Sequence, residues 1–146
     1  MFILEISIFL HMVGIALGVG GVTMSTILSA KAEKDKDMAK VIMKNMSTFS
    51  KVIWLGFILL VISGFGLVSS VKWPLDTGLL LAKHLVILLL FIVGVAIFFT
   101  QRRMRKHAPS GKELSKEFIS AKKRMKALGT VSLILWYLVV AVSVFI

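Results

Sequence analysis

The chain has 146 residues, of which 58% are hydrophobic and only 17% are charged. A soluble domain is nearer half apolar, with about a quarter of its residues charged, so this composition indicates a polytopic membrane protein without a separate soluble domain. The chain contains no cysteine. This absence excludes disulfides, thiolate metal sites, iron–sulfur clusters and a c-type haem attached through sulfur.

The net charge of +11 is gathered in two short segments. Of the 18 Lys and Arg residues, six lie between Lys31 and Lys51 and ten between Arg102 and Lys126. Basic loops that alternate with apolar spans follow the positive-inside rule and argue against nucleic-acid binding. We therefore expect a prokaryotic inner-membrane protein with both basic loops in the cytoplasm, and with both termini and the short KWPLDTG turn on the outer side.

Four apolar segments are long enough to cross a bilayer as helices, at approximately residues 3–30, 52–71, 78–101 and 127–146. The first charge is Glu5, with no basic segment before it, so the first span is expected to be a mature helix and not a cleaved signal peptide. The predicted fold is all-α, a single four-transmembrane-helix bundle over residues 1–146. The loop PSGKELSKEF offers Ser110 and Glu113 as a capping box. The second and fourth helices should thus extend several turns into the cytoplasm, where their basic faces meet lipid head groups or dock a soluble partner.

The first span, in EISIFLHMVGIALGVGGVTMS, places a histidine in hydrocarbon. A polar side chain there is costly, so His11 needs a partner or a function. Steps of three and four bring Gly14, Gly18 and Gly21 onto the same helix face as His11. A face of small residues permits the close approach of another helix or of the plane of a tetrapyrrole.

The third span carries a second histidine, His84, in GLLLAKHLVILLL. Counted from outer boundaries near Ile3 and Leu79, His11 and His84 lie roughly 12 and 8 Å deep. Two imidazoles at similar depth in a four-helix bundle can flank one haem iron. Alternatively, each imidazole hydrogen-bonds a serine or a carbonyl across a helix interface. The third histidine, His107, lies in the second basic loop and is not expected to take part.

Lys83 precedes the second histidine and is expected either to pair with Glu5 or to bind a haem propionate. The tryptophans have simpler expected positions: Trp54 at the inner interface, and Trp136 beside a cofactor or in the core. Copper transport would require Met or His side chains in a ladder through the membrane. Met12 lies about 100° round the helix from its neighbour His11, which is not a ladder.

With FLHMVGIALGVGG in the first span and LLLAKHLVILLL in the third, the chain resembles the HemJ-type membrane protoporphyrinogen oxidases and the related CopD-type copper-resistance membrane domains. His11 and the run Lys83 to Val86 match recurrent positions of that group. The chain lacks a second histidine later in the third span and has longer basic loops. The resemblance implies a haem b cofactor and a role in tetrapyrrole oxidation.

The expected function is thus a membrane b-type haem protein, with His11 and His84 as iron ligands and with Gly14, Gly18 and Lys83 beside the cofactor. It would act in electron transfer or in the oxidation of a protoporphyrinogen-like tetrapyrrole. Its expected partners are a membrane or soluble redox protein and, in a homo-oligomer, further copies of the same chain. One alternative is a CopD-like protein that handles copper. Another is a non-catalytic assembly subunit whose histidines only satisfy helix contacts.

Overall fold

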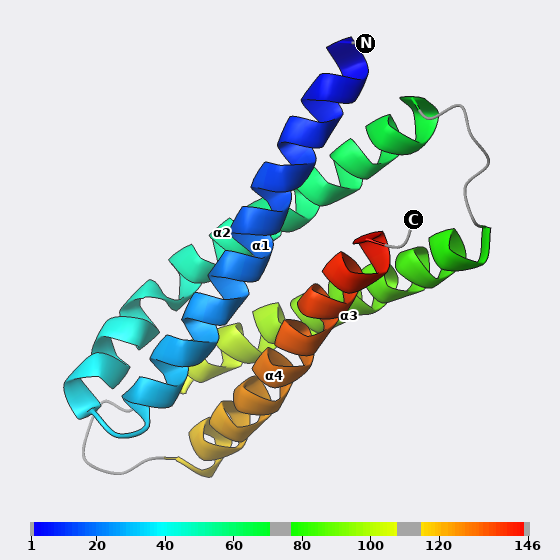
Figure 1. Ribbon diagram of the computed structural model, residues 1–146. Coiled ribbons are helices and arrows are strands. Elements are labelled where there is room, and N and C mark those ends of the chain that lie inside the picture. Colours follow the sequence, from blue (N-terminus) through cyan, green and yellow to red (C-terminus); the bar gives the residue numbers. More distant parts are fainter. Residues whose placement is uncertain (1, 71–76, 108–114, 145–146) are drawn as a thin grey trace.

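The computed structural model describes residues 2–70, 77–107 and 115–144. These residues form four helices: α1 (Phe2–Ala32), α2 (Lys36–Ser70), α3 (Thr77–Lys106) and α4 (Lys116–Val144) (Figure 1). All four are long and apolar enough to cross a membrane. The prediction of an all-α, four-span protein is confirmed.

Each helix is longer than a bilayer requires. The shortest, α4, has 29 residues, and about 20 residues span the hydrocarbon core. The helix α2 begins at Lys36 and α4 at Lys116, several turns before the apolar spans expected from residues 52 and 127. The predicted extensions of the second and fourth helices are confirmed, and α3 is also helical as far as Lys106.

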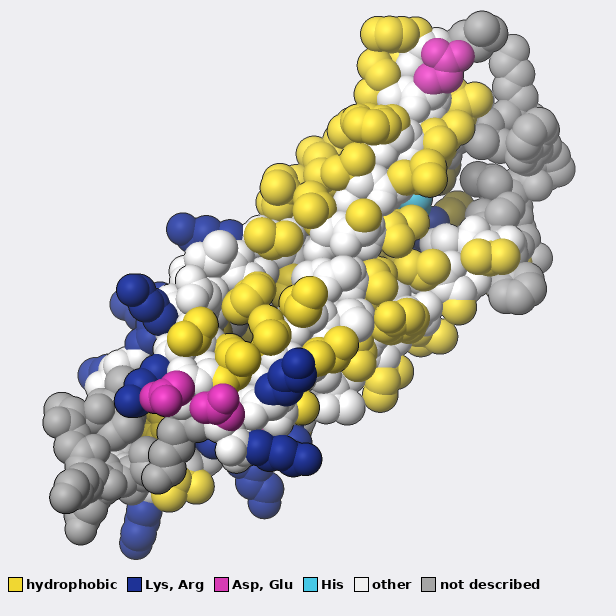
Figure 2. Space-filling model, turned by 60° about the vertical axis from the view of Figure 1, so that its left-hand side comes forward, with side chains coloured by type: hydrophobic (Ala, Val, Ile, Leu, Met, Phe, Trp, Pro, Cys, Tyr) yellow, Lys and Arg dark blue, Asp and Glu magenta, His cyan; other side chains and the backbone are white. Residues whose placement is uncertain are grey.

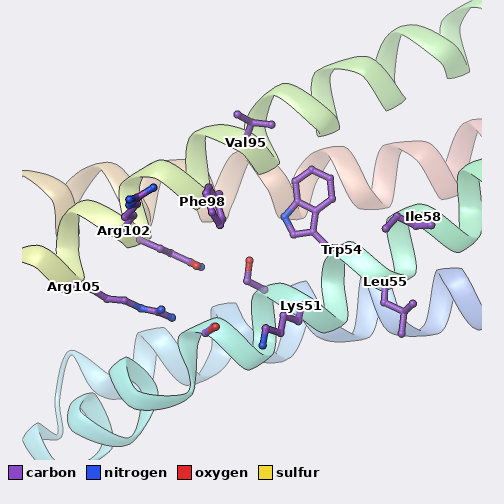
Figure 3. Close-up of a pocket in the computed structure, with 11 residues that line it drawn as sticks. Lys51, Trp54, Leu55, Ile58, Val95, Phe98, Arg102 and Arg105 are labelled. Carbon is purple, nitrogen blue, oxygen red and sulfur yellow. The ribbon is translucent and has the colours of Figure 1, made fainter.

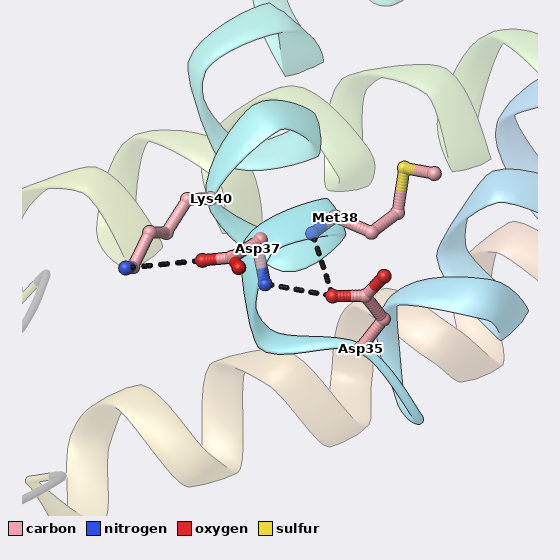
Figure 4. Close-up of polar contacts among 4 residues, drawn as sticks. All are labelled: Asp35, Asp37, Met38 and Lys40. Atoms are coloured by element: carbon pink, nitrogen blue, oxygen red, sulfur yellow. Dashed lines mark hydrogen bonds and ion pairs between the residues drawn. The ribbon is translucent and has the colours of Figure 1, made fainter.

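Short polar side chains begin two of these extensions. At α2, one carboxylate oxygen of Asp35 accepts hydrogen bonds from the backbone N–H groups of Asp37 and Met38, at 2.9 and 3.2 Å (Figure 4). At α4, the Ser115 hydroxyl accepts the N–H of Phe118 at 3.1 Å. Both satisfy donors that a helix N-terminus leaves without intrahelical partners. The capping box expected at residues 110 and 113 lies outside the described residues.

The four helices pack as two hairpins. The helix α1 lies along α2, and α3 lies along α4, while the hairpins meet mainly where α1 contacts α4 (Figure 1). A hydrogen bond between Thr23 and Tyr137, at 3.2 Å, joins α1 to α4. The helices α2 and α3 barely touch. The central core lies where the hairpins meet and consists of Val22, Leu60, Leu90, Trp136 and Val139.

Glycines bring α1 and α2 together. A β-carbon built at Gly56 of α2 would lie 2.5 Å from the backbone nitrogen of Gly18 and 2.9 Å from the carbonyl oxygen of Gly14. A β-carbon at Gly14 would in turn lie 2.9 Å from a side-chain carbon of Leu60. Only residues without a β-carbon permit this backbone separation, so these three glycines form a small-residue seam like those of many membrane helix pairs.

Charge distinguishes the two ends of the molecule. Large apolar side chains are exposed along its length, while Lys and Arg gather at one end (Figure 2). At this basic end the Lys126 ammonium lies 2.8 Å from a Glu33 carboxylate oxygen and ties the turn after α1 to α4. The hydrogen bond and the charge of Lys126 lower the pKa of Glu33 below its usual value.

Candidate functional site

His11 of α1 is half-buried and contacts α2 through one ring nitrogen. Its Nδ1 lies 2.8 Å from the hydroxyl oxygen of Ser63, whose residue is only 1% exposed. The Ser63 hydroxyl donates its one hydrogen to the carbonyl oxygen of Leu60, at 3.2 Å. When the single hydrogen of Ser63 is donated to Leu60, the hydroxyl accepts from His11, and in this arrangement the neutral imidazole carries its proton on Nδ1. The Nε2 atom then carries the lone pair.

His84 of α3 is exposed and bonds within its own helix. Its Nδ1 lies 2.7 Å from the carbonyl oxygen of Leu80. A carbonyl oxygen can only accept, so Nδ1 carries the proton here too, and Nε2 of the neutral ring carries the lone pair. His107 makes the same bond to the Arg103 carbonyl at 3.0 Å, but at the basic end of α3.

Lys83 lies nearer to His11 than its place in the sequence suggests. Its side chain is half-buried, and its ammonium is close enough to the His11 imidazole to interact with it electrostatically. Among the described residues Lys83 forms no ion pair with Glu5, which is exposed. Figure 2 shows a histidine and a basic side chain in a recess of the apolar surface, in the half away from the basic end.

The structure therefore brings His11, Ser63 and Lys83 into one neighbourhood, whereas His84 has a separate hydrogen bond. The helices α1 and α3 that carry the two histidines do not pack on each other. Within residues 2–70, 77–107 and 115–144, no cluster of three or more His, Asp or Glu side chains forms. An axial pair for haem iron requires only two side chains.

The predicted glycine face is covered by protein. Gly14 contacts α2, and a β-carbon at Gly18 would run into the ring of Trp136, which is 1% exposed. Of the two alternatives left open for this face, the contact with another helix is the one observed. Trp136 fills the core. These contacts also hold the preceding turn of α1 in place, so that the His11 ring lies against Ser63.

Ser63 is the residue that the sequence did not single out. It is separated from His11 by 52 positions, and nothing local to either residue connects them. Its one signal is a hydroxyl in the middle of an apolar span, and such hydroxyls commonly bond only their own helix. The pair of His11 and Ser63 can be recognised only once it is known that α1 packs on α2.

A groove with a volume of about 820 Å³ runs between α2 and α3 near the basic end (Figure 3). The loose contact between these two helices leaves this space. Trp54 rises from α2 toward α3, and Arg105 extends from α3 across the gap (Figure 3). No part of the groove was predicted, apart from the position of Trp54 near the inner interface.

The sequence comparisons identify a family. The model of the DUF2269 family, described as predicted integral membrane proteins, matches residues 5–145. This match covers nearly the whole chain, which therefore belongs to that family. Neither the curated proteins nor the solved structures yield a match. The family description agrees with the four membrane spans.

Proposed function

We propose that this protein binds a b-type haem in the outer half of the membrane through Nε2 of His11 and Nε2 of His84. It would then serve in electron transfer or in the oxidation of a protoporphyrinogen-like tetrapyrrole. The resemblance of FLHMVGIALGVGG and LLLAKHLVILLL to the HemJ-type oxidases supports the same proposal. The orientation expected from the basic loops puts this site on the outer side of a prokaryotic inner membrane.

The observation that carries the proposal is that both rings are hydrogen-bonded through Nδ1. The Leu80 carbonyl holds the proton of His84 on Nδ1, and the Ser63 hydroxyl does the same for His11 when it donates its own hydrogen to Leu60, so that Nε2 keeps the lone pair. Metal-binding histidines are usually held in this way, by a second hydrogen bond that fixes the tautomer and the ring orientation. The Leu60 carbonyl plays this part for His11 through the Ser63 hydroxyl. For His84 the Leu80 carbonyl does so directly.

The surroundings of the histidines fit such a cofactor. A haem held between α1 and α3 requires that these two helices stay apart, and they do not pack on each other. Lys83 offers a positive charge near His11 that can pair with a propionate carboxylate. The seam at Gly14 and Gly18 holds the turn that carries His11 in place. Haem iron supplies one-electron redox chemistry, which none of these side chains provides.

Copper is the alternative metal. Its protein sites commonly combine several His, Cys or Met ligands. Copper handling and a purely structural role for the histidines therefore stand as the alternative outcomes of the experiment.

The experiment is the absorption spectrum of the purified protein, oxidised and reduced, from cells supplied with ample haem. Six-coordinate low-spin haem gives sharp α and β bands on reduction. His11→Ala and His84→Ala should each abolish or weaken these bands, because each variant lacks one axial ligand. His107→Ala is the matched control: its ring makes the same hydrogen bond at the other end of the molecule, and its spectrum should equal that of the wild type.

A colourless protein that contains copper would overturn the haem proposal in favour of metal handling. A colourless protein without metal would assign the histidines to helix contacts alone.

A further inference from the structure

The groove between α2 and α3 is polar at one end and apolar at the other. At the basic end it is lined by Lys51, Arg102 and Arg105, with the polar side chains of Ser47, Ser50 and Gln101 between them. The other lining residues are Trp54, Leu55, Ile58, Val95 and Phe98. Residues from 52 in α2 and up to 101 in α3 belong to the apolar spans. The groove therefore runs from the membrane interface into the depth of the hydrocarbon.

The three basic side chains have no acidic partner among the described residues. No acidic side chain of residues 2–70, 77–107 and 115–144 lines the groove, and the ion pairs of these residues involve only Lys40 and Lys126 among the cations. Lys51, Arg102 and Arg105 are all exposed, and Arg105 points across the groove toward α2 (Figure 3). Serine hydroxyls beside guanidinium groups are the donors that a phosphate oxygen requires.

The apolar part has a fixed wall. The Trp54 ring stands edge-on to Phe57 and Phe91, with ring centroids 5.6 and 5.8 Å away. A β-carbon built at Gly94 of α3 would lie 3.0 Å from the Trp54 ring, so this glycine admits the indole. These contacts hold α2 and α3 together at one point, and the space between the helices opens toward the basic end.

We propose that this groove is a binding site for one anionic phospholipid of the leaflet at the basic end. The lipid phosphate lies among Lys51, Arg102 and Arg105, and an acyl chain follows the apolar wall at Trp54, Leu55 and Ile58. Basic pockets between membrane helices suit anionic head groups. A water-soluble acidic partner could satisfy the charges but not the apolar half, which lies at the depth of the acyl chains. The proposal is independent of haem.

The test is quenching of tryptophan fluorescence by brominated lipids in vesicles of phosphatidylcholine. Brominated phosphatidylglycerol is compared with brominated phosphatidylcholine at equal mole fraction. Each basic side chain near an anionic head group should raise the preference for phosphatidylglycerol about fivefold. Quenching of the wild type should therefore require a lower mole fraction of brominated phosphatidylglycerol than of brominated phosphatidylcholine. Trp54→Phe should lose the part of the fluorescence that is quenched preferentially by phosphatidylglycerol, because Trp54 is the indole in the groove.

Arg102→Gln with Arg105→Gln should reduce the preference about 25-fold, which is about fivefold for each charge removed. Arg102→Lys with Arg105→Lys keeps the charge and should keep the preference, which separates binding from a defect in folding. The matched control is Lys116→Gln with Lys123→Gln, which removes two exposed charges of α4 outside the groove and should leave the preference intact. Equal quenching of the wild type by both lipids would overturn the proposal. So would an equal loss of preference in the control, since that would indicate general attraction to the surface.

Discussion

The seam between α1 and α2 makes a strong prediction for Gly56→Ala. The added β-carbon would lie 2.5 Å from the backbone nitrogen of Gly18, whereas ordinary contacts begin at 3.4 Å. The atoms it meets belong to the backbone of α1, so no side-chain rotation relieves the overlap, and α1 must move away by about 0.9 Å. A separation of that size forfeits a quarter to a half of each van der Waals contact along the seam. Overpacking of this kind costs about 1–3 kcal/mol.

Gly64→Ala is the matched control, because it lies on the same helix and, apart from its own stretch of helix, no described atom lies within 4 Å of the position of its new β-carbon. Replacing glycine by alanine inside a helix stabilises it by about 0.5–1 kcal/mol. Both variants gain this helix propensity, so their free energies of unfolding should differ by the overpacking cost alone, about 1–3 kcal/mol. Unfolding is followed by circular dichroism in detergent, with temperature or denaturant as the variable. Equal stability of the two variants would refute the reasoning that backbone contact at Gly56 holds the hairpin together.

Three further predictions concern the site, the basic end and the orientation. Ser63→Ala removes the hydrogen-bond partner of His11 Nδ1 and should lower haem affinity about 10–100-fold, as loss of such a partner of a metal ligand typically does. The control in a haem titration is Ser69→Ala, whose exposed hydroxyl donates to the Gly66 carbonyl of its own helix. Because Lys126 lowers the pKa of Glu33 in the folded protein, their pairing stabilises the fold above the ordinary pKa of 4.5 and is lost as the pH falls below it. The difference in melting temperature between wild type and Glu33→Gln should accordingly be present at pH 7 and vanish in acid; a difference that does not change with pH would contradict the assignment. Ser110→Cys should react with a membrane-impermeant thiol reagent only from the cytoplasmic side and Thr77→Cys only from the outer side, and the reverse pattern would invert the expected orientation.

The membrane spans and the position of the charges could be predicted because both depend on local composition. About 20 apolar residues must be helical in a bilayer, whichever neighbours they have. The extension of α2 from Lys36 was likewise predictable, since residues 35–51 before the second apolar span contain no proline or glycine. The extension of α4 was expected from a capping box in the preceding loop. Local sequence was sufficient for the extensions of α2 and α4, whereas the extension of α3 to Lys106 was not predicted.

The pairing of the helices could not be predicted in the same way. In lipid no hydrophobic force selects one partner over another, so pairing depends on how closely particular surfaces fit. The small-residue face at Gly14 and Gly18 could be recognised from the sequence. Nothing in the sequence around Gly56 indicates that this glycine lies against that face. A bond from His11 to a serine across a helix interface was one of the expected alternatives, and it is observed, but the choice of Ser63 depends on this pairing. The groove between α2 and α3 also follows from the pairing and was not predicted.

The most direct measurement for the proposed haem site is chemical rescue of His11→Gly. This variant lacks the imidazole and leaves space for a free one beside Ser63. Reduced protein is examined by absorption spectroscopy with and without millimolar imidazole in the buffer. If His11 is an axial ligand, the variant should lose the sharp α and β bands, and imidazole should restore them. Retention of the wild-type spectrum in His11→Gly without imidazole would contradict ligation by this histidine.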